Sequence, residues 1–243
     1  MAQVIAVDVG GTNLRVALVE GKKILKLIKR KTPRDNFVEE LIKEISKLIN
    51  SNVRGIGIGT PGFFDKGKFV NSPNLKIPGN LIKIVERKFK KKVFVENDGN
   101  CVALAELKYG VKKKNFLVLT IGTGIGGGIV IDGKMYKGMG FAGEVGRMII
   151  NEGKDLEFFS GVNGLKRFGG EKRAEYLGKG IANLINIFDP EVVVLSGGAR
   201  YEGNKLLSKI KSEVKKYSLR KNVPIVWSKI REPGVIGAGL LIR

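Results

Sequence analysis

The sequence is poor in the residues that build disulfides and metal clusters. It has no histidine and a single cysteine, Cys101, in 243 residues. One cysteine excludes an internal disulfide and a cysteine zinc cluster. No apolar run approaches the roughly 20 residues that a membrane span needs, and the opening MAQVIAVDVG lacks the basic stretch and cleavage site of a signal peptide. These absences predict a cytoplasmic protein.

Glutamine is almost missing too. Gln3 is the only one, whereas lysine, isoleucine and glutamate are abundant. A scarcity of thermolabile amides favours a thermophilic source, although asparagine is not scarce.

The charge is strongly positive, since 44 basic and 23 acidic residues leave 44 − 23 = 21 net charges. A charge of this size can indicate nucleic-acid binding. Here the basic residues are spread along the chain beside apolar residues, as on solvated faces, and no aromatic platform is interleaved with them. We therefore expect no specific nucleic-acid partner, but a general attraction of anionic ligands such as nucleotides.

A glycine-rich phrase occurs twice. VDVGGTNLRVALVEGK covers residues 7–22 and LTIGTGIGGGIVIDGK covers 119–134, an offset of 119 − 7 = 112. At this offset Gly10 aligns with Gly122, and Leu18 aligns with Val130. Apolar runs joined by small-residue turns predict a β-hairpin in each copy. The alternative is two ordinary hairpins that share glycines by chance.

A third strand is expected after each hairpin, because Glu20-Gly21 and Asp132-Gly133 are typical of tight turns. Beyond the hairpins, strands and helices alternate. The expected helices are 34–50 (capped by Asp35 or Asn36), 80–92, 99–109, 160–168, 171–188, 203–220 and 233–242, and the expected further strands are 22–31, 53–60, 92–98 and 192–200.

This alternation predicts an α/β fold made of two related domains, each with a partly parallel sheet. We expect a small N-terminal domain at 1–108, joined by the C-terminal helix 233–243, and a larger domain at 109–232. An active-site cleft is expected between them.

Glycine turns expose backbone N–H groups and form anion-binding concavities. Two such turns predict a site for the β- and γ-phosphates of a nucleotide, with hydroxyl donors from Thr12 and Thr123. Asp8 precedes the first turn, where an acid is suited to hold Mg²⁺, directly or through water. A third glycine turn, Ser196-Gly197-Gly198, follows a buried strand, and ligands of α/β sheets gather at such ends.

Several acids accompany these turns. VENDGN (95–100) places Glu96, Asn97 and Asp98 between a strand and a helix, and Glu144 and Glu157 occur in or beside loops. Each alone is typical of a solvated acid or a helix cap. Together with phosphate-binding turns they indicate recognition of sugar hydroxyls, with one carboxylate taking the proton of the attacking hydroxyl.

These residues resemble a known family. Eight segments occur in the order found in sugar kinases of the ROK family (repressor, open reading frame, kinase), and they span nearly the whole chain. They are DVGGTNLR, GIGTPGFFD, NSPNLK, VENDGNCVALAE, TIGTGIGGGIV, GFAGEVG, LEFFSG and LSGGA. The family belongs to the actin-like ATPase and hexokinase superfamily, whose fold is a duplicated ribonuclease H-like domain.

The resemblance implies ATP- and Mg²⁺-dependent phosphorylation of a free hexose or hexosamine at its 6-hydroxyl. It implies that Asp98 is the general base and that Asp8 serves Mg²⁺. The sugar would be bound by Gly62, Asn74, Asn97, Asp98, Glu144, Arg147 and Glu157. The nucleotide would be bound by Asp8, Gly10, Gly11, Thr12, Thr123, Gly124, Gly197 and Gly198.

The sequence departs from the family pattern at Arg147, where the family has a histidine that touches both the sugar and a structural zinc. The cysteine-rich loop that normally follows is absent as well. We therefore expect no structural zinc and an altered sugar site, so that glucosamine, whose ammonium group suits a site of acids, is a candidate beside glucose.

The alternatives are another acceptor on the same fold, such as an N-acetylated sugar or a non-sugar, and a non-catalytic regulator that binds sugar or nucleic acid. The first hairpin starts at residue 3, so we expect no DNA-binding domain before it. The expected partners are therefore a sugar and a nucleotide, and family analogy adds a homodimer.

Overall fold

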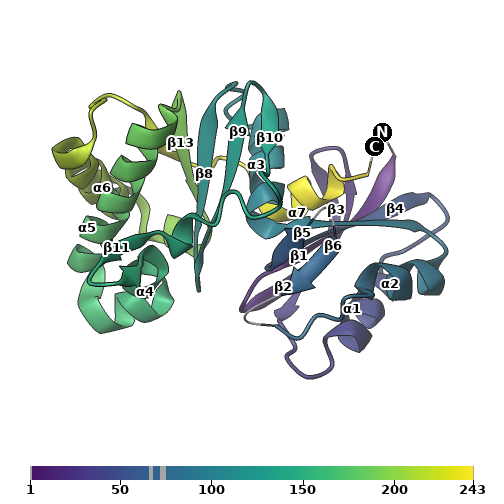
Figure 1. Ribbon diagram of the computed structural model, residues 1–243. Coiled ribbons are helices and arrows are strands. Elements are labelled where there is room, and N and C mark those ends of the chain that lie inside the picture. Colours follow the sequence, from purple (N-terminus) through teal and green to yellow (C-terminus); the bar gives the residue numbers. More distant parts are fainter. Residues whose placement is uncertain (1, 66–67, 72–74, 243) are drawn as a thin grey trace. The chain divides into compact units, whose positions relative to one another are not determined.

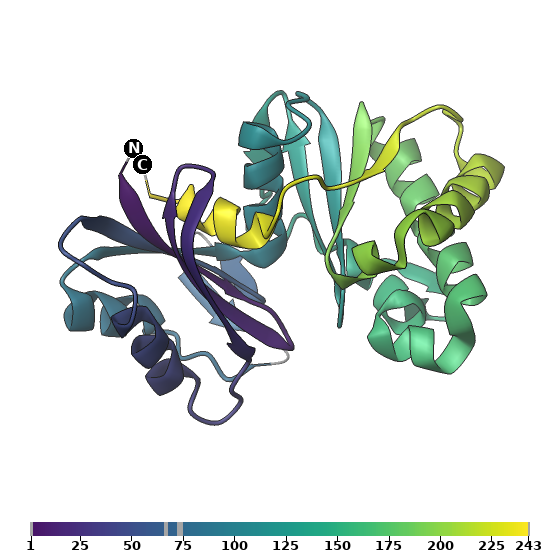
Figure 2. The ribbon, with the colours of Figure 1, turned by 180° about the vertical axis from the view of Figure 1, so that it is seen from behind.

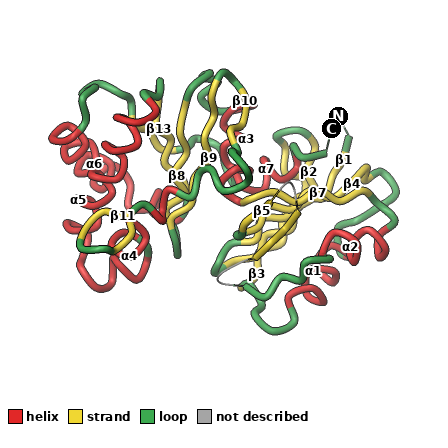
Figure 3. Tube along the Cα trace, viewed as in Figure 1, coloured by secondary structure: helices red, strands yellow, loops and turns green. Residues whose placement is uncertain are grey.

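The computed structural model describes residues 2–65, 68–71 and 75–242 (Figure 1). The chain forms two compact units. The first consists of Met1–Gly110, Lys137–Phe141 and Ile230–Arg243, and the second of Val111–Tyr136 and Ala142–Lys229. In both units helices alternate with strands (Figure 3). None of the helices in the described part of the chain is long and apolar enough to cross a membrane.

The first unit is built on a five-stranded sheet in the order β3-β2-β1-β4-β7. The strands β1 to β3 pair antiparallel, and β4 and β7 continue the sheet parallel to β1. The elements of this unit are β1 (Gln3–Val9), β2 (Asn13–Glu20), β3 (Lys23–Lys31), α1 (Phe37–Ser46), β4 (Val53–Thr60), the small hairpin β5 (Phe63–Asp65) and β6 (Lys68–Asn71), α2 (Leu81–Phe89), β7 (Lys92–Asn97), α3 (Asp98–Tyr109) and α7 (Pro233–Gly239).

Alternation along β1 sorts the side chains of this sheet onto two faces. Ile5 and Val7 pack with residues of α1 and α2. Val4 and Ala6 pack on the opposite face with residues of α3 and α7, where α7 lies against α3 (Figure 2). By the same alternation Asp8 belongs to the face that α7 covers.

The second unit repeats this plan with a sheet in the order β10-β9-β8-β13-β14. Again two strands are added antiparallel on one side of the first strand and two parallel on the other. Its elements are β8 (Phe116–Ile121), β9 (Ile125–Ile131), β10 (Lys134–Tyr136), the 3₁₀ turn η1 (Val145–Arg147), the ribbon β11 (Ile149–Asn151) and β12 (Lys154–Asp155), α4 (Leu156–Ser160), α5 (Val162–Phe188), β13 (Val192–Ser196), the 3₁₀ turn η2 (Gly198–Glu202), α6 (Gly203–Tyr217) and β14 (Ile225–Trp227). The predicted duplication of an α/β unit is therefore confirmed.

The two hairpins differ in their turns. Val9 pairs with Leu14 in the first hairpin, which leaves four residues in the turn, and Ile121 pairs with Ile125 in the second, which leaves three. On the second strand the copies are therefore offset by 125 − 14 = 111 residues, not 112. The predicted alignment of Leu18 with Val130 was wrong by one residue, because a residue lost from the turn shifts everything that follows it.

One helix is shorter than expected, and a predicted break between two others is present. The helix α1 covers only Phe37–Ser46, and Asn36 at its N-cap makes no capping hydrogen bond through its side chain. The predicted break between the helices 160–168 and 171–188 is confirmed, because α5 consists of two helical stretches that meet at a kink at Gly169, where φ is 77° and ψ is 172°; the first stretch begins at Val162. Only glycine adopts this backbone conformation readily, so the break is encoded in Gly169 itself.

Candidate functional site

The first glycine turn lies at the carboxyl end of β1. Its backbone is held from both sides: Gly10 N donates to Asn13 O over 2.9 Å, and Thr32 donates its N–H to Thr12 O and its hydroxyl to Gly10 O. Gly11 and Thr12 themselves are exposed. The turn is thus rigid and open to a ligand, as an anion-binding turn must be.

Asp8 lies directly before this turn, beneath α7. A Cβ on Gly234 in α7 would come within 2.8 Å of the Asp8 carboxyl carbon. Arg15, opposite Asp8 in the hairpin, donates from its Nη1 to the carboxylate over 2.9 Å, and its Nε lies 2.9 Å from the carboxylate of Glu232. Burial raises the pKa of Asp8. The positive charge of Arg15 lowers this pKa, and the negative charge of Glu232 raises it.

Arg15 and Glu232 are not among the predicted site residues. Hairpin register would have placed Arg15, because cross-strand partners lie on the same face of the sheet. Glu232 has no such local signal, since it is brought to Asp8 by the return of the chain into α7.

The turn from β7 into α3 carries Asn97 and Asp98, as the sequence predicted. Asn97 caps the helix, because its Oδ1 accepts from the N–H of Asn100 over 3.1 Å. Its Nδ2 donates to Gly62 O over 3.4 Å, so that Gly62 and Asn97 lie together. Asp98 is the first residue of α3, where one carboxylate oxygen accepts from Gly99 N over 2.9 Å, and the helix dipole favours negative charge at this end.

Glu96 is a supporting residue rather than part of an open acidic cluster. It is buried, and its Oε1 accepts from Asn97 N and from the side-chain amide of Asn100, over 2.9 and 3.0 Å. Its other oxygen forms an ion pair with Lys137. These contacts hold the turn that presents Asn97 and Asp98.

The second glycine turn belongs to the second unit and is tied to Glu157. Gly122 N donates to Gly124 O, and Val162 N at the start of α5 lies 3.2 Å from the carbonyl oxygens of both Gly122 and Thr123. Glu157 Oε2 accepts from Ile125 N over 2.8 Å. A Cβ on Gly124 would lie 2.3 Å from that oxygen, so glycine is required there for the carboxylate to approach.

Glu157 reaches this position because α4 begins at Leu156, four residues before the predicted helix. Asp155 caps α4, accepting from Phe158 N over 2.8 Å, and aspartate is a preferred N-cap. The sequence therefore contained a local signal for this earlier start.

Arg147 joins the acids of this unit. Its Nη1 lies 3.2 Å from Asp155 Oδ2 and its Nη2 lies 3.8 Å from Glu157 Oε1. Burial raises the pKa of Glu144, which Arg147 lowers and Glu157 raises further. The guanidinium of Arg147 thus lies against Asp155 and Glu157, and its charge also acts on Glu144.

The third glycine turn follows β13. Gly197 has a φ of 88°, and a Cβ there would lie 2.6 Å from Ile121 O, whereas a Cβ on Gly198 would meet no atom within 4 Å. Gly197 thus packs against the end of β8, next to the second turn, and Gly198 faces open space. The predicted site residue Asn74 lies outside the described residues.

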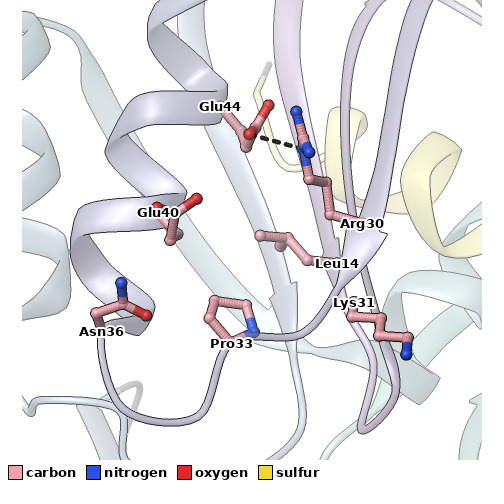
Figure 4. Close-up of a pocket in the computed structure, with 7 residues that line it drawn as sticks. All are labelled: Leu14, Arg30, Lys31, Pro33, Asn36, Glu40 and Glu44. Atoms are coloured by element: carbon pink, nitrogen blue, oxygen red, sulfur yellow. Dashed lines mark ion pairs between the residues drawn. The ribbon is translucent and has the colours of Figure 1, made fainter.

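One pocket of about 250 Å³ lies elsewhere in the first unit, between α1 and the strands β2 and β3 (Figure 4). Arg30 and Glu44 form an ion pair of 2.9 Å in its wall. The residues that line it are Leu14, Arg30, Lys31, Pro33, Asn36, Glu40 and Glu44, and none of them is a predicted site residue.

The fold is shared with solved proteins of the ROK family. The crystal structure of a ROK family glucokinase from Streptomyces griseus in complex with glucose and AMPPNP superposes with a TM-score of 0.88 over 99% of both chains, at 23% sequence identity. The model of the ROK family matches residues 4–165 and 170–243. The chain therefore belongs to the ROK family, as the motifs indicated.

Two curated relatives show the breadth of this family. A glucokinase from Halalkalibacterium halodurans is 30% identical over 98% of this chain and 94% of its own length. A xylose repressor from Caldicellulosiruptor bescii is 29% identical over 82% of this chain and 67% of its own length. Similarity thus extends to kinases and to repressors.

Proposed function

We propose that this protein is an ATP- and Mg²⁺-dependent kinase that phosphorylates a free hexose or hexosamine at its 6-hydroxyl. The observation that carries the proposal is the position of Asp98. It stands at the carboxyl end of β7, on the first turn of α3, beside Asn97 and its partner Gly62. A carboxylate beside amide and carbonyl groups is suited to orient a hydroxyl and take its proton.

In the proposed reaction Asp98 accepts the proton of the 6-hydroxyl, the hydroxyl oxygen bonds to the γ-phosphorus of ATP, and the bond from that phosphorus to the bridging oxygen breaks to release ADP. Asn97, Glu144 and Glu157 are proposed to orient the sugar, with Arg147 holding Glu157. Gly62 and Asn74 are proposed to complete the sugar contacts.

The described residues fit a magnesium nucleotide. Gly11 and Thr12 are exposed at a turn that is fixed by its own backbone, and Asp8 provides a carboxylate beside it. Mg²⁺ commonly takes one or two protein carboxylates and completes its shell with water and phosphate oxygens. When bound, the ion neutralises charge that develops on the transferred phosphoryl group. Gly10, Gly11, Thr12, Thr123 and Gly124 are proposed to bind the phosphates, and Gly197 and Gly198 the nucleoside.

The test measures sugar-dependent release of ADP in a coupled assay with ATP and Mg²⁺ at elevated temperature. The acceptors are glucose, mannose, fructose, glucosamine, N-acetylglucosamine and N-acetylmannosamine. Turnover with glucose or glucosamine is the expected result. A clear preference for an N-acetylated sugar would replace the proposed acceptor, and neutral glucose strongly preferred over glucosamine in matched kinetics would contradict a role of the acids in binding an ammonium group.

We expect Asp98→Asn to lower turnover roughly 10²–10⁴-fold while sugar affinity is retained, because the amide keeps the shape but cannot take the proton. Asp132→Asn, at an exposed acid in the turn before β10, is the matched control and should leave kcat unchanged. A non-catalytic regulator, the alternative that the xylose repressor raises, would bind sugar with no ADP release in wild type or variant.

A further inference from the structure

The second unit, which carries the second and third glycine turns, contains a fully buried cation. Arg173, on α5, is 1% exposed and is among the largest completely buried side chains of the described residues. A guanidinium taken out of water requires partners, because an unpaired buried charge costs several kcal/mol. The placement of those partners therefore indicates what Arg173 does.

Arg173 joins two segments that are far apart in the sequence. Its Nε donates to Ser160 O at the end of α4 over 2.9 Å, and its Nη1 forms an ion pair with Glu202 at the end of η2. The Ser160 hydroxyl lies 3.4 Å from Arg173 O and donates to it. A guanidinium presents several donors in one rigid plane, so it bridges two partners where an ammonium would reach one.

The first of these segments supports the second glycine turn. Ser160 is followed by Gly161 and Val162, and the N–H of Val162 lies 3.2 Å from Gly122 O and from Thr123 O. A Cβ on Gly161 would lie 2.8 Å from Thr123 O. Displacement of Ser160 would therefore move the backbone that holds this turn.

The second segment supports the third glycine turn. Glu202 is the last residue of η2, the 3₁₀ turn that begins at Gly198. Arg200 N donates to Gly197 O over 3.3 Å within the same segment. The ion pair with Arg173 thus anchors the far end of the segment that leaves Gly197 and Gly198.

We infer that Arg173 is a positioning residue for the nucleotide: through Ser160 and Glu202 it holds the turn at 122–124 and the turn at 197–198 in fixed relation. The inference rests on the proposed function, which assigns phosphates to the first of these turns and the nucleoside to the other. Arg173 acts through the backbone of both turns and need not touch the ligand.

The test compares Arg173→Met with wild type by direct measurement of ATP affinity in the full chain and by steady-state kinetics. Methionine fills a similar volume, and apolar replacement of a buried ionic group is often tolerated by the fold. We expect the Kd for ATP to rise on the order of 10-fold, with the KM for the sugar within twofold of wild type. Arg173→Lys retains the charge but can reach one partner fewer, so it should give a smaller rise in the Kd for ATP.

Arg220→Met is the matched control, because Arg220 pairs with Asp189 at a site where both side chains are 61% exposed; its ATP affinity should equal that of wild type. A Kd for ATP unchanged in Arg173→Met, or a Kd and a sugar KM that rise together, would overturn the inference and leave the kinase proposal standing. If Arg173→Met does not fold, Glu202→Gln decides in the same way. Wild type that binds no ATP would overturn the kinase proposal and this inference with it.

Discussion

Arg147 is the residue at which this chain differs most in chemistry from the pattern that its motifs resemble. Its guanidinium contacts Asp155, which caps α4, and Glu157, which holds the glycine turn through Ile125 N. The positive charge of Arg147 thus contacts the acid that caps α4 and the acid that holds the glycine turn, and it lowers the pKa of Glu144.

The pH dependence of the reaction should report on Arg147. The sugar contact proposed for Glu144 is made best by a carboxylate, and Arg147 lowers the pKa of Glu144 against the effect of burial. In Arg147→Met this pKa should rise, so the acidic limb of the kcat/KM profile should move to higher pH. Arg147→Lys retains the charge and should move the limb less. An acidic limb in the same place for wild type and Arg147→Met would show that Glu144 does not control it.

Residue-scale predictions succeeded where the information is local. Asn97 and Asp98 were found at the end of a strand because the apolar run and the acids that follow it are adjacent in the sequence. Arg173 was not anticipated, because its partners lie 13 and 29 residues away and come together only when α5 packs on the sheet.

At the scale of elements, the glycine turns illustrate two different uses of the same residue. Gly124 is glycine because the Glu157 carboxylate occupies the space of its Cβ. Gly122 in the same turn would meet no atom within 4 Å with a Cβ added. Packing therefore requires glycine at position 124 but not at position 122.

Substitution of these two glycines should separate stability from binding. Gly124→Ala displaces the Glu157 carboxylate from Ile125 N, so we expect a loss of about 1–3 kcal/mol in the free energy of unfolding and a clear fall in the melting temperature. Gly122→Ala should leave the melting temperature nearly unchanged, because its methyl group would meet no atom within 4 Å. It should raise the KM for ATP, because Gly122 adjoins Thr123 and Gly124, which are proposed to bind phosphate. Equal melting temperatures for both variants would contradict the packing argument.

Element types were predictable from the sequence, whereas element bounds were less so. Two hairpins followed from apolar alternation around glycines, and the duplication followed from their repetition. The one-residue difference between their turns was not visible in the sequence. Both turns consist largely of glycine and threonine, so the two copies can be aligned at either offset. The break in α5 at Gly169 was predictable from the pair Gly169-Gly170, which separates the two helical stretches.

At the scale of the whole molecule, the chain is shorter than the alignment with its glucokinase relative. Its alignment with the glucokinase of H. halodurans is 311 positions long, so at least 311 − 243 = 68 positions of the alignment have no residue of this chain. The match of the family model is interrupted at residues 166–169, which end at the break in α5. Each of the two units nevertheless has a five-stranded sheet.

The net charge of +21 acts on the molecule as a whole. Positive potential raises the local concentration of anions and is screened by salt, with a Debye length of about 10 Å at 0.1 M. We expect the KM for ATP to rise several-fold between about 50 and 300 mM salt, while the KM for neutral glucose stays within about twofold. A KM for ATP that is insensitive to salt would show that the nucleotide is attracted by local contacts alone.

The same experiment separates charge from nucleic-acid recognition. Binding to DNA through charge alone falls steeply over this range of salt and does not depend on sequence. A sequence-dependent affinity that persists at 300 mM would contradict the expectation of no specific nucleic-acid partner.

The return of the chain into α7 has a consequence for biosynthesis. Helix α7 covers the face of the first sheet that carries Val4 and Ala6, and it closes over Asp8. The ribosome delivers α7 only after the whole second unit has emerged, so in a nascent first unit that apolar face is covered by α3 alone. The second unit, continuous in sequence but for residues 137–141, meets no such delay. The acid proposed to serve magnesium is therefore enclosed last, and a chain interrupted before residue 233 would leave it open to water.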